Sequence, residues 1–354
     1  MKRRAVVVKI GSSTLVDERG RPRARVFSQV AAQVAALTAD STPVVIVTSG
    51  AIALGLGALG RERRPRRLAE LQAASAVGQS LLVRRWERAL GRSGARGAQV
   101  LLTVGAIHRR DGYLNARRTL ETLLGWGLVP VVNENDSTAT DEISFGDNDA
   151  LAAQVAVLLR ARLLVLLTDI NGLYDRDPTS PGAALVEEVA DHRLLDALEV
   201  GGGGSSWGSG GMRSKVVAAE MASTGGVTAV IASGRRPGSL LQAASGARVG
   251  TRFRADPSPL PAYKLWIRYG KPVHGRLHVD AGAREALVSR GTSLLAVGVQ
   301  AVDGSFAAGD AVEICQSGEV FAIGLSGHPA AELRRLAGAR GVDEAVHRDN
   351  LVVL

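Results

Sequence analysis

The sequence predicts an α/β protein, a three-layer α/β/α sandwich with a mainly parallel sheet followed by a small β-barrel-like domain. Apolar segments rich in valine, isoleucine and leucine alternate with helical segments, which is typical of parallel strands covered on both faces. Several apolar segments end in glycine or polar residues, at the strand ends where such sheets bind ligands. The expected strands are 5–10, 43–50, 98–103, 128–133, 163–169 and 227–233, and the expected helices include 26–37, 51–58, 68–91 and 149–160.

A proline-rich segment at residues 256–261 divides the chain into a large and a small part. We expect a first domain over 1–256, a linker over 257–271 and a second domain over 272–354. The second part has short strands separated by glycine turns and one helix near 281–290, which predicts a small β-rich, barrel-like domain.

The composition excludes several classes of protein. No apolar run approaches the roughly 20 residues that a membrane span needs, and the apolar stretch near the first residues is too short for a signal peptide. The single cysteine, Cys315, excludes an internal disulfide framework and a cysteine-based metal cluster, so we expect a buried structural thiol. These features together predict a cytoplasmic protein without a membrane partner.

Charge is distributed unevenly along the chain. The formal net charge is +9, but residues 257–354 contain 10 basic and 10 acidic residues, so the excess lies in the first domain. Part of the excess is the run Arg61–Arg67, which we interpret as a solvated loop in preference to an anion-binding patch. Only five of the 43 basic residues are lysine: Lys2, Lys9, Lys215, Lys264 and Lys271.

Two of these lysines, Lys9 and Lys215, lie in glycine-rich segments. Lysine is a compact, mobile point charge suited to following a phosphoryl group, whereas arginine is a rigid fork. Lys9 ends an apolar strand, so its ammonium either enters the ligand crevice or faces solvent at the sheet edge. Lys215 ends GSGGMRSK, 208–215, where loop amides and a helix start favour phosphate over a plain linker.

Two other glycine-containing segments have competing interpretations. GLGALG, 55–60, matches the dinucleotide-binding pattern, but it lies near a helix end and lacks the acidic residue expected about 20 positions later, so we reject it. Ser49, Gly50 and Ala51 follow an expected strand, where a hydroxyl and backbone amides either bind a ligand or simply cap the next helix.

Carboxylates and amides are concentrated in NENDSTATDEISFGDND, 133–149, beside an expected strand end. An alternative to a ligand site is that Asp147 or Asn148 caps the helix expected at 149–160. A cap explains one of the residues Asp147, Asn148 and Asp149 but not all three.

The segments VVKIGSSTL, VTSGAIALG, VVNENDSTATDEISFGDND, LLTDINGLYDRDP and GSGGMRSK occur in an order that resembles the amino acid kinase family. Residues 274–314 resemble a PUA domain, which some members of that family carry. The resemblance covers nearly the whole chain, and Phe145 and Arg213 stand at variable motif positions. The three parts are therefore expected to be a kinase domain, a linker and a PUA domain.

The resemblance implies ATP-dependent phosphorylation of the γ-carboxylate of L-glutamate to L-glutamyl 5-phosphate, the first step of proline biosynthesis. A family member acting on another acid, such as acetylglutamate, is the alternative. Lys9 and Lys215 would neutralise the transferring phosphoryl group, and Asp149 would orient both lysines. Mg²⁺ would be held mainly by the phosphates, with no protein ligand assigned.

The remaining implied roles concern binding. The residues expected to hold glutamate are Ser49, Gly50, Ala51, Asn133, Asp136, Asp147 and Asn148. The residues expected to hold ATP are Lys9, Gly11, Thr168, Asp169, Ser209, Gly210, Gly211, Met212, Arg213, Ser214 and Lys215.

The family also implies a homo-oligomer, a dimer or tetramer, and proline as a feedback inhibitor. A PUA domain raises RNA as a partner, but the balanced charge of residues 257–354 weighs against it because phosphate neutralisation dominates nucleic-acid affinity.

Overall fold

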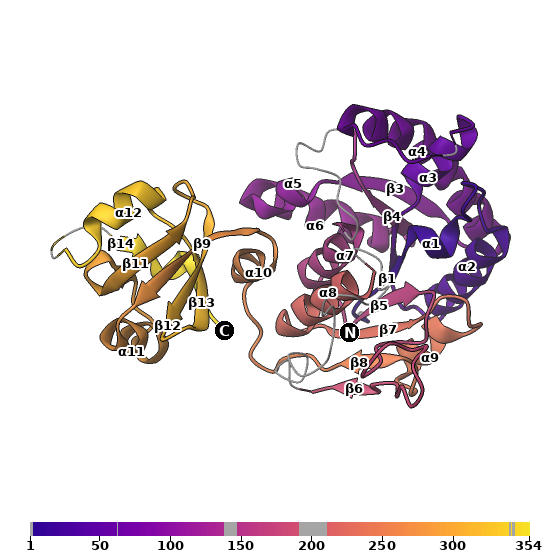
Figure 1. Ribbon diagram of the computed structural model, residues 1–354. Coiled ribbons are helices and arrows are strands. Elements are labelled where there is room, and N and C mark those ends of the chain that lie inside the picture. The colour runs from indigo at the N-terminus through magenta and orange to yellow at the C-terminus, as the bar shows by residue number, and fades with distance from the viewer. Residues whose placement is uncertain (1–2, 62, 138–146, 191–210, 340, 342–343) are drawn as a thin grey trace. The chain divides into compact units, whose positions relative to one another are not determined.

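The computed structural model describes residues 3–61, 63–137, 147–190, 211–339, 341 and 344–354. The chain divides into two compact units, Met1–Pro259 and Leu260–Leu354, which are described separately. Figure 1 shows the path of the chain through each unit. Within the described residues, no helix is long and apolar enough to cross a membrane.

The first unit is built on one sheet with the strand order β3-β4-β2-β1-β5-β7-β8-β6. Neighbouring strands are parallel except for the antiparallel pair β7–β8, so the predicted mainly parallel sheet is confirmed. The strands are β1 Val6–Ile10, β2 Val44–Thr48, β3 Gly97–Leu102, β4 Val129–Glu134, β5 Leu163–Thr168, β6 Glu188–Val189, β7 Thr228–Ser233 and β8 Thr251–Phe253.

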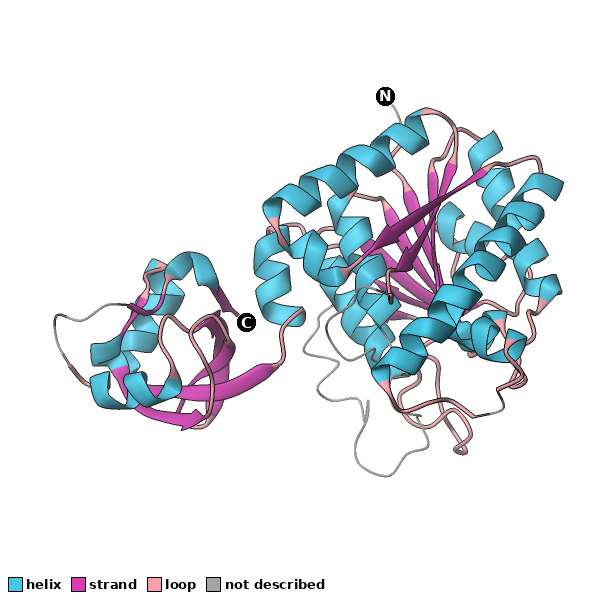
Figure 2. Cartoon of the chain, turned by 90° about the horizontal axis from the view of Figure 1, so that it is seen from above, coloured by secondary structure: helices cyan, strands magenta, loops and turns pink. Residues whose placement is uncertain are grey.

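Helices lie on both faces of this sheet (Figure 2). Helices α2, α4 and α9 share a core with one face of the sheet, whereas α6, α7 and α8 contact its strands outside that core. The helices are α1 Ser12–Leu15, α2 Ala24–Ala39, α3 Ala51–Ala58, α4 Leu68–Arg92, α5 Val104–His108, α6 Arg110–Gly125, α7 Asp147–Leu158, α8 Met212–Thr224 and α9 Ser239–Ser245.

The central strand β1 determines which way Lys9 points. Val6, Val8 and Ile10 belong to the core formed with α2 and α4. Because successive side chains of a strand point to opposite faces, Val7 and Lys9 point to the other face. Helix α7 contacts β1 and is not part of that core, so Lys9 is directed towards α7.

Several elements differ from the sequence-based expectation. Helix α7 begins at Asp147 instead of residue 149, so Asn148 lies inside its first turn and does not cap it. Helix α6 was not predicted, because only Ala116 and Leu120 are buried along it and its apolar stripe is correspondingly thin. The short strands β6 and β8 were also missed.

The second unit contains a five-stranded sheet, order β11-β9-β12-β13-β15, and a two-stranded sheet, β10-β14. The strands are β9 Val273–Val279, β10 Leu294–Leu295, β11 Val299–Gly304, β12 Ala311–Gln316, β13 Glu319–Leu325, β14 Glu344–Val346 and β15 Leu351–Val353, and the α-helices are α10 Ala262–Tyr269, α11 Ala281–Arg290 and α12 Ala330–Leu336. Cys315 is buried on β12. Helix α10 falls inside the segment expected as a linker; it buries Leu265 and Ile267 and contacts β13 and β15.

Helices α3 and α4 approach each other closely through glycine. A Cβ atom added at Gly55 would lie 1.8 Å from the carbonyl oxygen of Ala74, and one added at Gly78 would lie 1.7 Å from that of Ala51. The first glycine of GLGALG therefore allows two helices to pack and lies well inside α3, away from any strand-to-helix turn. This contact fixes the first turn of α3, which follows β2, against the middle of α4.

We expect Gly78→Ala to destabilise the first unit by about 3 kcal/mol, because the new methyl group cannot fit without separating the two helices. Gly91→Ala is the matched control: Gly91 lies in the same helix with open space around it, so alanine should stabilise the helix by about 0.5–1 kcal/mol. Urea unfolding of both variants measures the difference. Equal stabilities would contradict the close packing of α3 and α4.

Candidate active site

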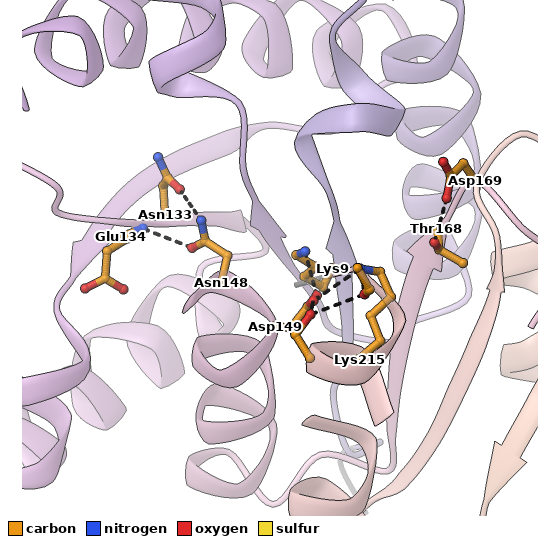
Figure 3. Close-up of polar contacts among 10 residues, drawn as sticks. Lys9, Asn133, Glu134, Asn148, Asp149, Thr168, Asp169 and Lys215 are labelled. Atoms are coloured by element: carbon orange, nitrogen blue, oxygen red, sulfur yellow. Dashed lines mark hydrogen bonds and ion pairs between the residues drawn. The ribbon is translucent and has the colours of Figure 1, made fainter. Parts of the chain in front are cut away.

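A buried carboxylate between two lysines forms the centre of the site (Figure 3). Lys9 Nζ lies 2.5 Å from Asp149 Oδ1, and Lys215 Nζ lies 3.3 Å from Asp149 Oδ2. The side chains of Lys9 and Asp149 are 5% and 1% exposed, and that of Lys215 is 12% exposed. The three residues come from β1, α7 and α8, so the fold brings together segments separated by up to about 200 positions. The ion pairing expected of Asp149 is thus present.

Burial and charge act in opposite directions on this cluster. Burial alone would raise the pKa of Asp149, but the attraction of Lys9 and Lys215, with hydrogen bonds from Lys9 and Ser214, lowers it below its ordinary 3.8. Burial lowers the pKa of Lys9 below 10.5, the neighbouring Lys215 lowers it further, and Asp149 only partly offsets these effects. The site thus places two lysine side chains around a single carboxylate, two formally positive groups against one formally negative group.

The first turn of α8 positions Lys215. Its ammonium donates a hydrogen bond of 2.8 Å to the carbonyl oxygen of Gly211, the residue before the helix. Ser214 Oγ donates to Asp149 Oδ2 at 2.8 Å, so two successive side chains of α8 contact the same carboxylate oxygen. On the other side of the cluster, a Cβ at Gly11 would lie 3.6 Å from Lys9 Nζ, which places the Gly11 backbone next to that ammonium.

A network of amides lies beside the charged cluster. Asn148 Nδ2 donates to Asn133 Oδ1 at 3.2 Å, and Asn148 Oδ1 accepts from the Glu134 backbone N–H at 3.2 Å (Figure 3). Asn133 Nδ2 in turn donates to Gln79 Oε1 of α4 at 2.7 Å. Asn148 precedes Asp149 on α7, so the amide network and the lysine cluster are held by adjacent residues of one helix.

Further along the same strand edge, Asp136 is buried and accepts a 2.6 Å hydrogen bond from Ser75 Oγ. Arg64 belongs to the run expected to be a solvated loop. Desolvation lowers the pKa of its guanidinium, and electrostatic attraction to Asp136 partly opposes this lowering. At the end of β2, Gly50 has φ = 108°, a left-handed conformation that favours glycine, and it precedes α3.

Besides Lys9 and Gly11, the described residues expected to contact the nucleotide lie at the end of β5 and at the start of α8. Thr168 ends β5, is buried, and donates to Asp169 Oδ1 at 3.1 Å. Gly211, Met212, Arg213, Ser214 and Lys215 surround the first turn of α8. Ser209, Gly210 and residues 138–146 lie outside the described residues, as does the side chain of Asp147.

Sequence reasoning missed Ser75 and Gln79, which contact the predicted substrate residues from α4. Their only sequence signal is a spacing of four, which places both on one helix face. They stand among alanines in an otherwise ordinary helical segment.

Two cations on a buried carboxylate, at the carboxyl edge of a parallel sheet, define a site suited to phosphoryl transfer between anions. The chain belongs to the amino acid kinase family, whose model matches residues 4–233. A model of the PUA domain matches residues 275–348.

Relatives of high sequence identity show which members of the amino acid kinase family this chain is similar to. The chain is 46% identical to a glutamate 5-kinase of Ralstonia nicotianae, covering 99% of this chain and 97% of the relative. It is 43% identical to one of Pelobacter propionicus, covering 100% and 98%, and 42% identical to one of a Synechococcus strain, covering 99% and 98%. An N-acetylglutamate synthase structure from Neisseria gonorrhoeae matches with a TM-score of 0.53 at 22% identity, covering 72% of this chain and 60% of that one, which supports the fold alone.

Proposed function

We propose that the chain transfers the γ-phosphoryl group of ATP to the γ-carboxylate of L-glutamate, giving L-glutamyl 5-phosphate and ADP. One observation carries this proposal: Lys9 and Lys215 are held on either side of Asp149, next to the amide network of Asn148 and Asn133. The likeness to glutamate 5-kinases over nearly the full length supports L-glutamate as the acceptor.

In this reaction an oxygen of the γ-carboxylate forms a bond to the γ-phosphorus of ATP while the bond from that phosphorus to the ADP oxygen breaks. Both reactants are anions, so positive groups fixed at the transferring phosphoryl lower the barrier more than covalent help would. Lys9 and Lys215 supply this charge. Asp149 keeps both ammonium groups in place without neutralising them completely, because it provides one negative charge against two positive ones.

The binding roles follow from the chemistry of the two substrates. The substrate ammonium requires an acceptor, for which we propose Asp136, and the carboxylates require donors, for which we propose Asn148, Ser49 and nearby backbone amides. Thr168, Asp169 and the segment from Ser209 to Lys215 are proposed to hold ATP.

Mg²⁺ fits this site as a companion of the ATP phosphates. Among the described residues, no group of three or more histidine, cysteine, aspartate or glutamate side chains could hold a metal ion. Both oxygens of Asp149 are occupied by lysines and Ser214, so this carboxylate is poorly placed to be a metal ligand. Magnesium keeps several waters and few protein ligands, and its contribution would be to neutralise phosphate charge.

A panel of acceptors tests the proposal. ADP release is measured with L-glutamate, N-acetyl-L-glutamate and L-aspartate as acceptors at equal concentration, with ATP and Mg²⁺. L-Glutamate should give the highest kcat/KM. Activity with N-acetyl-L-glutamate and none with L-glutamate would show that the acceptor is assigned wrongly.

Assembly into a dimer or tetramer and inhibition by proline belong to the same proposal and are supported by the family likeness alone. Binding of RNA by the second unit is opposed by its balanced charge. A shift assay of residues 257–354 alone with RNA across a salt series checks this, and we expect no shift at low salt.

The lowered pKa of Lys9 predicts that this side chain titrates at a lower pH than an ordinary lysine. Because the folded-state pKa lies below 10.5, Lys9 loses its proton as the pH rises through a value lower than that of an ordinary lysine. With only five lysines, NMR of ¹³Cε-labelled lysine resolves the titrations individually, and Lys9→Met identifies the Lys9 signal. A Lys9 titration at or above 10.5 in the ATP-free protein would contradict this prediction.

A further inference from the structure

One turn of α4 contacts the proposed glutamate side of the site at three places. Ser75 and Gln79 are four residues apart, so their side chains emerge on the same face of the helix. Gly78 lies between them and contacts the carbonyl oxygen of Ala51 so closely that no side chain fits. None of these three residues was among those predicted to bind either substrate.

Ser75 fixes the orientation of Asp136. Its hydroxyl donates a 2.6 Å hydrogen bond to Asp136 Oδ2, and the two residues are 3% and 9% exposed. A hydrogen bond from a neutral donor to a buried carboxylate is one of the stronger kinds in proteins. It holds one carboxylate oxygen, so the rotation of the Asp136 side chain is restricted.

Gln79 acts on Asn148 through Asn133. Gln79 Oε1 accepts from Asn133 Nδ2, which turns Asn133 Oδ1 towards Asn148 Nδ2. Asn148 Oδ1 then faces the Glu134 backbone N–H. Asn148 donates to Asn133, and Asn133 donates to Gln79. The acceptor oxygen of Gln79 therefore sets the orientation of the Asn148 side chain. An amide carries two N–H groups, and Asn133 Oδ1 accepts from one of those of Asn148.

We propose that Ser75 and Gln79 are positioning residues for the amino acid substrate: Ser75 orients Asp136 for the ammonium, and Gln79 orients Asn148 for a carboxylate. The close contact at Gly78 and Ala51 ties this turn of α4 to the start of α3, so the groups around glutamate are held as one unit. This inference rests on the proposed function, because it concerns how the same substrate is held.

Ser75→Ala tests the first half. The KM for L-glutamate should rise by about tenfold or more, the size expected for a lost hydrogen bond to a charged group, while the KM for ATP changes less than twofold. Ser80→Ala is the matched control, because it makes the same chemical change on the same helix. Among the described residues, Ser80 donates to the carbonyl oxygen of Val77 and not to a residue of the site. Its constants should equal those of the unaltered protein.

A second readout separates positioning from a general structural role. Glutarate is glutamate without the ammonium group, so its inhibition constant should change much less in Ser75→Ala than the KM for glutamate does. Equal losses for glutarate and glutamate, a parallel rise in the KM for ATP, or a glutamate KM within twofold of normal would each overturn the role of Ser75.

Gln79→Met tests the second half at a partly exposed position. It should raise the KM for glutamate, but have no further effect once Asn133 is replaced by alanine, because Gln79 acts through Asn133. Additive effects would overturn this role. If the unaltered protein releases no ADP with L-glutamate, the proposed function itself fails. If the unaltered protein is active and both variants have normal kinetic constants, only the inference about Ser75 and Gln79 fails.

Discussion

Replacing Lys215 by arginine should lower turnover by about 100-fold or more while the KM for L-glutamate stays nearly unchanged. The ammonium of Lys215 contacts both the Gly211 carbonyl oxygen and Asp149, and it is nearly buried. A planar guanidinium keeps the charge but is larger and cannot follow the moving phosphoryl group from the same position. Steady-state kinetics with varied glutamate and saturating ATP measures both constants.

Lys271→Arg is the matched control for this experiment. Lys271 is also partly buried and donates a 2.7 Å hydrogen bond to a backbone carbonyl oxygen, that of Gly309, but it belongs to the second unit. Its replacement should leave turnover unchanged. Near-normal turnover of Lys215→Arg would show that the site needs charge alone and that the preference for lysine has no mechanistic basis.

Replacing Asp149 by asparagine should reduce both activity and stability. The change leaves the Lys9 and Lys215 ammonium groups close together without their counter-charge, and breaking a buried ion pair costs about 3–5 kcal/mol. Turnover should fall by about 100-fold or more, because the lysines separate and no longer meet the transferring phosphoryl group. Asp40→Asn, at an exposed pair with Arg3, should change stability by only about 0.5 kcal/mol.

The pH dependence of this effect follows from the lowered pKa of Asp149. A carboxylate whose folded-state pKa lies below 3.8 stabilises the fold fully above that value, and the contribution disappears as the pH falls through the folded-state pKa. The stability difference between the unaltered protein and Asp149→Asn should therefore be constant from about pH 5 to 8 and shrink below about pH 4. A difference that vanishes near neutral pH would mean that Asp149 is not charged in the folded state.

Most of the sheet was predictable because its strands are short segments dominated by apolar residues. Residues such as Val6–Ile10 and Leu163–Thr168 have no competing helical interpretation at that length. Helix α6 was missed because its buried face consists of little more than Ala116 and Leu120. Helix α10 was missed because it follows a proline-rich segment, and its buried residues Leu265 and Ile267 find their partners only in the folded second unit.

The charged centre of the site was also predictable from sequence, since lysine is rare in this chain. Lys9 and Lys215 stand out against 38 arginines, and Asp149 lies in a motif too rich in acids to be only a helix cap. The supporting residues were not predictable. Ser75 and Gln79 share a helix face but have no distinctive neighbours, and their importance arises only when they contact Asp136 and Asn133 in the folded protein. Such contacts depend on tertiary structure, which local patterns do not encode.

Trapping of the acyl phosphate with hydroxylamine tests the central claim most directly. The chain is incubated with L-glutamate, ATP, Mg²⁺ and hydroxylamine, and both ADP and L-glutamate γ-hydroxamate are quantified. If the γ-carboxylate accepts the phosphoryl group, one hydroxamate should form for each ADP released, and both should be lost in Lys9→Met. Glutamate-dependent ADP release without hydroxamate, or hydroxamate formation from N-acetyl-L-glutamate alone, would contradict the account.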